Sequence, residues 1–542
     1  MPTSSLPPPG ALVTLRGIVS KPALNGRKAR VLARDYSVEA CAGYAKGRVP
    51  VLLAGGGGTM TLKPEALEVT PEPEPRAAAA RPAAPTVAAP AASQTDSGGE
   101  LLAVLHEIWT LQLAGRRELE VGGPPGDLVA KMGKLEHAIA RLTRLAVDAT
   151  NARKLAANGA FDVVLGTAEA YAGLAGVQEK VLSALHNLCS ADDAAGCERK
   201  MRAVERGALD TVVAAMRAHP AHLTIQEEAC GAIRNLCLGM DLDGVLARRA
   251  RSARAGALEM VVQALRMPRA PSSLRAQACA ALNNLCWGDD DAVALVQKQQ
   301  AIQMGALEAM LTAMVGSPTD DAIQESCCWV LCTLCVGDDA AAAERKQSVV
   351  TAGALEAIVA ALEAQADNAG VQERGCQALQ RVCDGEDEQV EGRCVRAAAA
   401  GAMEAIVRSL SSFVQSEEVV EASCTALCSI CYGTTAAADA RCERAAQAGA
   451  LDAVTAAMAA HTTTSGVQQQ ACAALANLCA GFDEFGDARR QRAVDLGAIE
   501  AVIAASETEG MSDMALRAIC ARSAQLREQA LAAGADRAIF SA

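Results

Sequence analysis

The chain has 542 residues, a formal net charge of −13 and only 2% aromatic residues, and this balance excludes several classes of protein. The acidic charge argues against wholesale nucleic-acid binding, which needs a basic surface. No apolar run reaches the roughly 18 residues of a membrane-spanning helix, and the first residues lack the pattern of a signal peptide. We therefore expect the 21 cysteines, an odd number, to be free thiols in a reducing compartment, which predicts a cytoplasmic or nuclear protein.

Residues 1–10 are predicted to be disordered, and residues 11–69 form a separate module. Short runs rich in Val and Leu alternate with Gly, Pro and Asn, which is the pattern of short strands joined by turns. The segment resembles small SH3-like modules that accompany repeat domains, and this resemblance implies a small five-stranded β-barrel.

The same module has nine Lys or Arg residues against four acids, a net charge of +5. A basic face is predicted at Arg27, Lys28, Arg30 and Arg34. It could bind an acidic peptide, RNA or the acidic loops of the same chain, or it could be a solvated surface, which we favour.

Residues 70–100 are rich in Pro and Ala with almost no large apolar residue, so we predict a disordered, semi-extended linker. Helical periodicity follows at 101–115 and 127–149. We expect residues 101–158 to cap the end of the array that comes next and to cover its first apolar face.

A dipeptide Gly-Ala followed by an apolar residue recurs with a period of 48 or 49 residues. It begins at residues 159, 207, 256, 305, 353, 401, 449 and 497. In the first seven units, a cysteine follows each Gly by 30 residues, the last of them Cys479 after Gly449. A constant core with all length variation in one segment is typical of stacked repeats, so residues 159–542 are predicted to be an array of seven full units and a shortened terminal unit from 497.

Within a unit the apolar residues follow helical spacing. In 226–239, Ala229, Cys230, Ile233, Leu236 and Cys237 form one apolar stripe. Each unit is predicted to contain a short first helix, a Gly corner, a second helix, a loop and a third helix. Acidic segments precede the first helix, where Asp is favoured as an N-cap.

These residues, such as "ERKMRAVERGALDTVVAAM" followed by "IQEEACGAIRNLC", resemble the armadillo repeat family over roughly 150–542. The resemblance implies a mainly α protein, a right-handed armadillo-type α-solenoid beside the N-terminal barrel. The period exceeds the usual family unit of about forty residues, with the excess in the acidic loop before the first helix.

The cysteines Cys230 and Cys237 lie on the apolar stripe, and we interpret them as small buried hydrophobes. Two Cys-x-x-Cys pairs, 332–335 and 428–431, raise the alternatives of a metal or redox site. A zinc site needs four converging ligands and a thioredoxin-like motif needs a βαβ context, and neither is indicated here. We predict no metal site and no cofactor.

An amide recurs two residues before the closing cysteine of several units. The third helices of armadillo proteins line a concave groove where Asn binds the main chain of an extended peptide, so the resemblance implies peptide contacts at Asn187, Asn235, Asn284 and Asn477. The alternative is that each Asn only caps its helix end or holds a water. Trp329 and Arg381 are further candidates on the same face. Trp329 stands one turn before the Asn position of its unit, and Arg381 stands at the Asn position of its own unit. A single Trp in its column argues against an import receptor of the importin-alpha type.

No histidine pairs with a plausible nucleophile, so we predict no catalytic residues and no enzyme. We expect a monomeric scaffold or adaptor that binds extended or helical segments of protein partners along the groove. The alternative is a transport or nucleic-acid-associated adaptor that uses the basic barrel.

Overall fold

A computed structural model describes residues 12–15, 28–31, 49–53, 59–62, 67–69, 96–121, 125–288, 292–481, 484–505 and 510–540. The chain divides into two compact units, which are described separately below. The first contains residues 1–261 and 284–297, and the second contains residues 262–283 and 298–542.

The N-terminal module contains five short strands in one antiparallel sheet of order β4-β3-β2-β1-β5. They are β1 (Leu12–Leu15), β2 (Lys28–Val31), β3 (Val49–Leu53), β4 (Thr59–Leu62) and β5 (Leu67–Val69). Closure of this sheet into an SH3-like barrel stays a prediction. The segments expected to be disordered, 1–10 and most of 70–100, lie outside the described residues, although the first helix already begins within the second of them, at Asp96.

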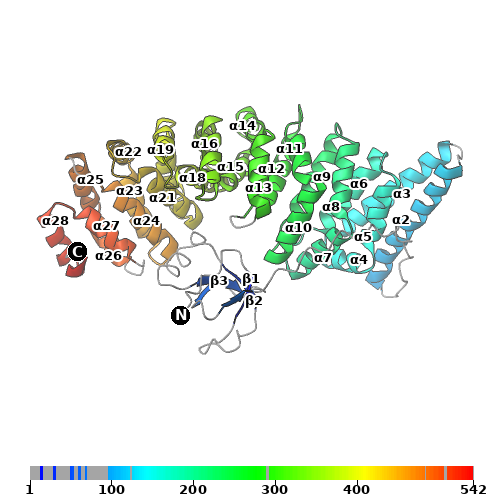
Figure 1. Ribbon diagram of the computed structural model, residues 1–542, viewed down its shortest axis with the longest axis horizontal. Helices are drawn as coiled ribbons and strands as arrows, with labels where there is room; N and C mark the ends of the chain where they lie inside the picture. The colour runs from blue at the N-terminus through cyan, green and yellow to red at the C-terminus, as the bar shows by residue number, and fades with distance from the viewer. Residues whose placement is uncertain are drawn as a thin grey trace. The chain divides into compact units, whose positions relative to one another are not determined.

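In the first unit, two long helices precede repeated helical triplets (Figure 1). The long helices are α2 (Asp96–Val121) and α3 (Pro125–Leu145). The triplets comprise α4 (Ala149–Ala157), α5 (Ala160–Ala170) and α6 (Ala175–Leu188), then α7 (Ala194–Glu205), α8 (Ala208–Ala218) and α9 (Leu223–Leu236), and then α10 (Leu242–Ala255). Leu101, Val104, Leu105 and Ile108 of α2 are buried, and α2 and α3 pack on α5 and α6, while a capping role for residues 101–158 stays a prediction.

The triplet continues through α11 (Ala257–Leu265), α12 (Ser272–Cys286) and α13 (Ala292–Gln303), which carry the chain from the first unit to the second. The second unit continues with α14 (Ala306–Gly316), α15 (Asp321–Cys335), α16 (Ala340–Thr351), α17 (Ala354–Ala364), α18 (Ala369–Cys383), α19 (Val390–Ala399), α20 (Ala402–Ser412) and α21 (Glu417–Cys431). It ends with α22 (Ala436–Gln447), α23 (Ala450–Ala460), α24 (Ser465–Leu478), α25 (Glu484–Asp495), α26 (Ala498–Ala504), α27 (Met511–Ile519), α28 (Ala524–Ala532) and the 3-10 helix η3 (Arg537–Phe540).

The corner between first and second helices depends on glycine. The eight corner glycines have φ between 81° and 96°, a left-handed conformation that residues with a Cβ rarely adopt. The acidic segments act as predicted at several helix starts. For example, the side chains of Asp193 and Asp339 accept hydrogen bonds from the backbone N–H groups of Gly196 and Ala342, both at 2.7 Å.

The third helices form the most closely packed layer of each unit. Neighbouring third helices, such as α15, α18, α21 and α24, pack side by side more closely than the second helices of neighbouring repeats do (Figure 1). The stripe of Ala229, Cys230, Ile233, Leu236 and Cys237 on α9 is fully buried, as its spacing predicts. Each of these third helices therefore contributes to the core on one side. The partly exposed residues Trp329, Gln377, Arg381 and Thr425, on α15, α18 and α21, define the surface called here the third-helix surface.

No single described helix is long and apolar enough to cross a membrane. One bent pair, Ala340–Thr351 with Ala354–Ala364, is long and apolar enough when its two helices are taken together, by length and composition only.

Candidate functional site

The four asparagines of the predicted groove lie on third helices, and each donates a hydrogen bond to the helix before it. The Nδ2 atoms of Asn187, Asn235, Asn284 and Asn477 lie 3.1, 2.9, 2.9 and 2.9 Å from the carbonyl oxygens of Thr143, His186, Arg234 and Cys428. Each bond joins third helices of neighbouring repeats, or α6 to the cap helix α3. We call these contacts the Asn clamps.

Asn235 and Asn284 are only 5% exposed, so neither amide lies open at the surface as a residue lining a groove would. The preceding third helix covers the C-terminal end of each Asn-bearing helix. A projection of one helix alone does not include that neighbour. Asn187 and Asn477 are partly exposed. Peptide binding by the four asparagines stays a prediction, with one amide donor of each already held by the fold.

In the other three full repeats, the position of this Asn is taken by Thr333, Arg381 and Ser429. The Thr333 hydroxyl hydrogen-bonds the Asn283 side chain, so this repeat keeps a polar link of another kind. The partly buried Arg381 side chain has no hydrogen bond or ion pair with any residue in the described part of the chain. Arg381 is therefore the position where the column presents an uncompensated cation.

Trp329 on α15 belongs to a polar network with α18. The guanidinium carbon of Arg374 lies 4.9 Å from the centroid of the Trp329 ring, a cation–π distance. Arg374 also donates through Nη1 to Gln377 Oε1 at 2.8 Å, and Gln377 Nε2 donates to Glu373 Oε1 at 3.0 Å. The network holds an aromatic ring and long polar side chains in place on a partly exposed surface.

Charge is unevenly distributed along these helices. The N-terminal halves of α15, α18 and α21 carry Glu325, Glu373, Glu417, Glu418 and Glu421, balanced in part by Arg374. Burial, together with the neighbouring carboxylates of Glu417 and Glu418, raises the pKa of Glu421. In the C-terminal halves of α15, α18 and α21, Arg381 is the charged residue, and Cys332, Thr333, Gln380, Cys428 and Ser429 are among the uncharged ones.

Sequence reasoning missed a set of buried arginines on the first helices. Each donates through Nε to a carbonyl near the end of the preceding third helix, and each is at most 3% exposed. They are Arg199, Arg248, Arg345, Arg393, Arg441 and Arg489, whose Nε atoms lie 2.6–3.3 Å from the carbonyl oxygens of Leu188, Leu236, Leu334, Val382, Ile430 and Leu478. They satisfy helix-end carbonyls that would otherwise be buried without a partner.

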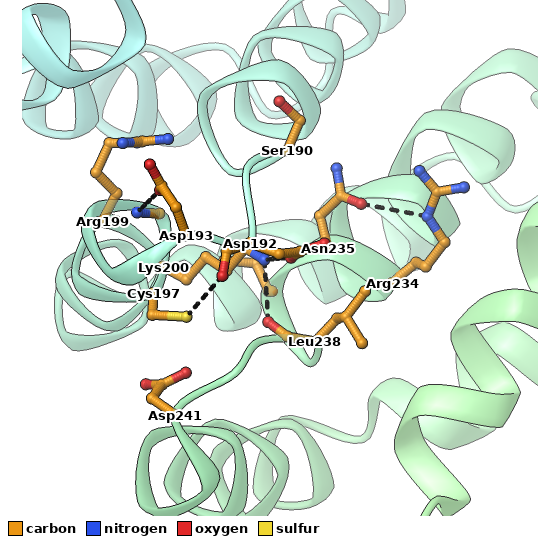
Figure 2. A network of polar contacts seen from close by, with 12 residues as sticks. Ser190, Asp192, Asp193, Cys197, Arg199, Lys200, Arg234, Asn235, Leu238 and Asp241 are labelled. Atoms are coloured by element: carbon orange, nitrogen blue, oxygen red, sulfur yellow. Dashed lines mark hydrogen bonds and ion pairs between the residues drawn. The ribbon is translucent and has the colours of Figure 1, made fainter. Parts of the chain in front are cut away.

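A second buried cation extends this link. Lys200 Nζ donates to Asp192 and, at 3.0 Å, to the carbonyl of Leu238, as Figure 2 shows. Lys346 reaches the carbonyl of Asp384 in the same way, at 2.9 Å. One first helix therefore connects the C-terminal ends of two third helices. A signal for the buried arginines was available in the sequence, because an Arg stands eight positions before six of the eight Gly corners.

A buried glutamine column is the other feature that the sequence did not reveal. Gln372 donates through Nε2 to the carbonyls of Leu362 and Gln365 at 2.8 and 2.9 Å, and Gln178, Gln226, Gln324 and Gln468 do the same in their own repeats. These side chains fasten the loop between second and third helices. They position the third-helix surface rather than form part of it.

The described cysteines are buried except for Cys332 and Cys428, which are partly exposed. Burial raises the pKa of several thiols, for example Cys189 and Cys479 to about 12, which is the behaviour of a packed hydrophobe. Within the described ranges, no three His, Cys, Asp or Glu side chains gather as metal ligands would.

The predicted basic face of the N-terminal module is described only in part. Lys28 and Arg30 lie in β2, opposite Thr14 and Leu12 of β1, whereas Arg27 and Arg34 lie outside the described residues. Binding by this face stays a prediction.

Comparison with known proteins gives a fold but no family. No protein-family model matches the chain, and no curated protein matches its sequence. The structure is similar to a solved chain from "A conserved phosphorylation switch controls the interaction between cadherin and beta-catenin in vitro and in vivo", with a TM-score of 0.52 and 14% sequence identity. The match covers 72% of this chain and 66% of that one, so this chain spans about two thirds of its length. The likeness supports an armadillo-like α-solenoid, as the resemblance implied.

Proposed function

We propose that this chain is a non-enzymatic scaffold or adaptor that binds segments of partner proteins along its third-helix surface. The observation that carries the proposal is the row of partly exposed, long polar and aromatic side chains around Trp329 and Gln377. Arg374 stacks on Trp329 and hydrogen-bonds Gln377, which hydrogen-bonds Glu373, whereas the clamp Asn, buried Arg and buried Gln side chains bind backbone carbonyls of the array. An ordered, partly exposed surface that includes a Trp and an Arg has the composition of a protein interface.

Two further points support this function. The similar solved chain comes from work on an interaction between proteins, cadherin and beta-catenin. Neighbouring third helices also build one surface from several repeats, which suits a segment of chain better than a small substrate. We further propose that the protein acts as a monomer in a reducing, cytoplasmic or nuclear compartment, where its thiols stay free.

A pair of matched bulky substitutions tests the proposal. Thr425 lies on the third-helix surface of α21, and Thr312 lies on the second helix α14. Both hydroxyls donate to the carbonyl four residues earlier, that of Glu421 at 2.7 Å and that of Glu308 at 2.6 Å. Thr425→Trp should obstruct the surface, whereas Thr312→Trp makes the same chemical change elsewhere.

We expect proteins captured from lysate by the wild-type chain to be retained by Thr312→Trp and reduced at least about tenfold by Thr425→Trp, a change of about 1.4 kcal/mol in binding. Quantitative mass spectrometry measures the recovery, and circular dichroism confirms that both variants stay helical. Equal recovery by all three proteins would exclude the third-helix surface as the binding site.

A further inference from the structure

Arg381 departs from the column in which it stands. In four repeats the equivalent residue is an Asn that clamps the preceding third helix, as Asn477 does with the carbonyl of Cys428 at 2.9 Å. Arg381 makes no such bond, and no ion pair, with any residue of the described ranges. The α18 repeat therefore has a charged side chain at the position where those four repeats have a clamping Asn.

No carboxylate of the described residues is bonded to Arg381. The C-terminal halves of α15 and α21, which pack on α18, carry uncharged side chains, among them Cys332, Thr333, Cys428 and Ser429. The carboxylate of Asp384, three residues on, accepts a hydrogen bond from Gln380 Nε2 at 3.3 Å rather than from Arg381. Glu373 is eight residues away, about 12 Å along the helix at 1.5 Å per residue, and is bonded to Arg374 and Gln377.

A partly buried guanidinium without a counter-ion has lost hydration without a compensating ion pair. A carboxylate can restore that interaction with two parallel charge-assisted hydrogen bonds. We infer that Arg381 binds an acidic side chain of the partner segment, so that this surface selects extended segments carrying Glu or Asp. The inference rests on the proposed function, because it assigns the partner's chemistry at that surface.

The exchange also predicts an effect that needs no ligand. In Arg381→Asn, the new amide can form the clamp that the other repeats have. The variant should therefore unfold at a Tm no lower than that of the wild type, while losing its preference for acidic segments. An arginine with a structural role would behave in the opposite way, with a lower Tm after replacement.

The test uses the full chain and three fluorescein-labelled peptides of nine residues, Ser-Thr-Leu-Ala-Ser-X-Ala-Thr-Ser, with Glu, Gln or Lys at X. By fluorescence anisotropy, the wild type should bind the Glu peptide at least about tenfold more tightly than the Gln peptide, and the Lys peptide most weakly. Arg381→Asn should bind the Glu and Gln peptides alike. Arg396→Asn is the control: it removes the same charge from an exposed position on α19, and should keep the preference.

A Glu preference that survives in Arg381→Asn, a preference for Lys, or no binding of any of the three peptides would each overturn the inference. The proposed function is judged separately. Peptide binding that is insensitive to Arg381 but abolished by Thr425→Trp would leave the surface as the binding site through uncharged contacts. Binding unaffected by either change would contradict both.

Discussion

Replacing Arg393 by alanine is expected to lower the free energy of unfolding by about 2–5 kcal/mol, the range for truncating a large buried side chain, here with the loss of a buried hydrogen bond. Arg393 is 1% exposed. Its Nε donates to the carbonyl of Val382 at 2.7 Å, and its two terminal nitrogens donate to Asp387 at 2.7 and 2.6 Å. These hydrogen bonds hold the pKa of Asp387 at about 2, well below its ordinary range. Alanine would leave the Val382 carbonyl without this donor and would leave a cavity.

The matched control lies on the same helix. Arg396 is three residues further along α19, exposed, and paired with Glu356 at 3.1 Å. Exposed pairs of this kind contribute about 0.2–1 kcal/mol, so Arg396→Ala should change stability little. Urea unfolding followed by circular dichroism measures both. Similar losses for the two variants would show that the buried arginines do not hold the repeats together.

Asn235→Ala is expected to lower the free energy of unfolding by about 1–3 kcal/mol, because it removes a buried hydrogen bond between repeats. The Nδ2 atom of Asn235 donates to His186 O at 2.9 Å, and its Oδ1 accepts from Arg234 Nε at 3.2 Å. The control Gln447→Ala removes an exposed amide that bonds Glu443 of its own helix, and should have almost no effect. The same urea measurement compares the two.

The Asn235 variant also separates the two roles that the sequence left open. Unchanged partner recovery by a destabilised but folded Asn235→Ala would assign this Asn to the clamp alone. A partner lost from the folded variant would support the peptide contact that the armadillo resemblance implies. A variant as stable as the wild type would contradict the clamp.

The array itself could be predicted from the sequence because its signals are local. A Gly at φ near 90°, an acidic N-cap and an apolar stripe each depend on a few neighbouring residues, so their recurrence set the period and the order of helices.

The contacts between repeats could not be predicted in this way. The burial of Asn235 and Asn284 depends on a helix about fifty residues earlier, and a single helix projection contains no such neighbour. The buried arginines were missed because a charged residue on a short polar helix is normally solvated, and only the helix-end carbonyls packed against them reverse that expectation. The chemistry of a partner depends in turn on which residues at these positions are already hydrogen-bonded within the fold.

The measurement that tests the proposed surface most directly is site-specific photo-crosslinking of the full chain in lysate. A benzophenone amino acid replaces either Gln377, partly exposed on α18 beside Trp329, or Gln447, exposed on the first helix α22. We predict partner adducts from position 377 and none above background from position 447, with the adducts lost when Thr425→Trp is added. Adducts at 447 alone, or equally at both positions, would contradict binding along the third-helix surface.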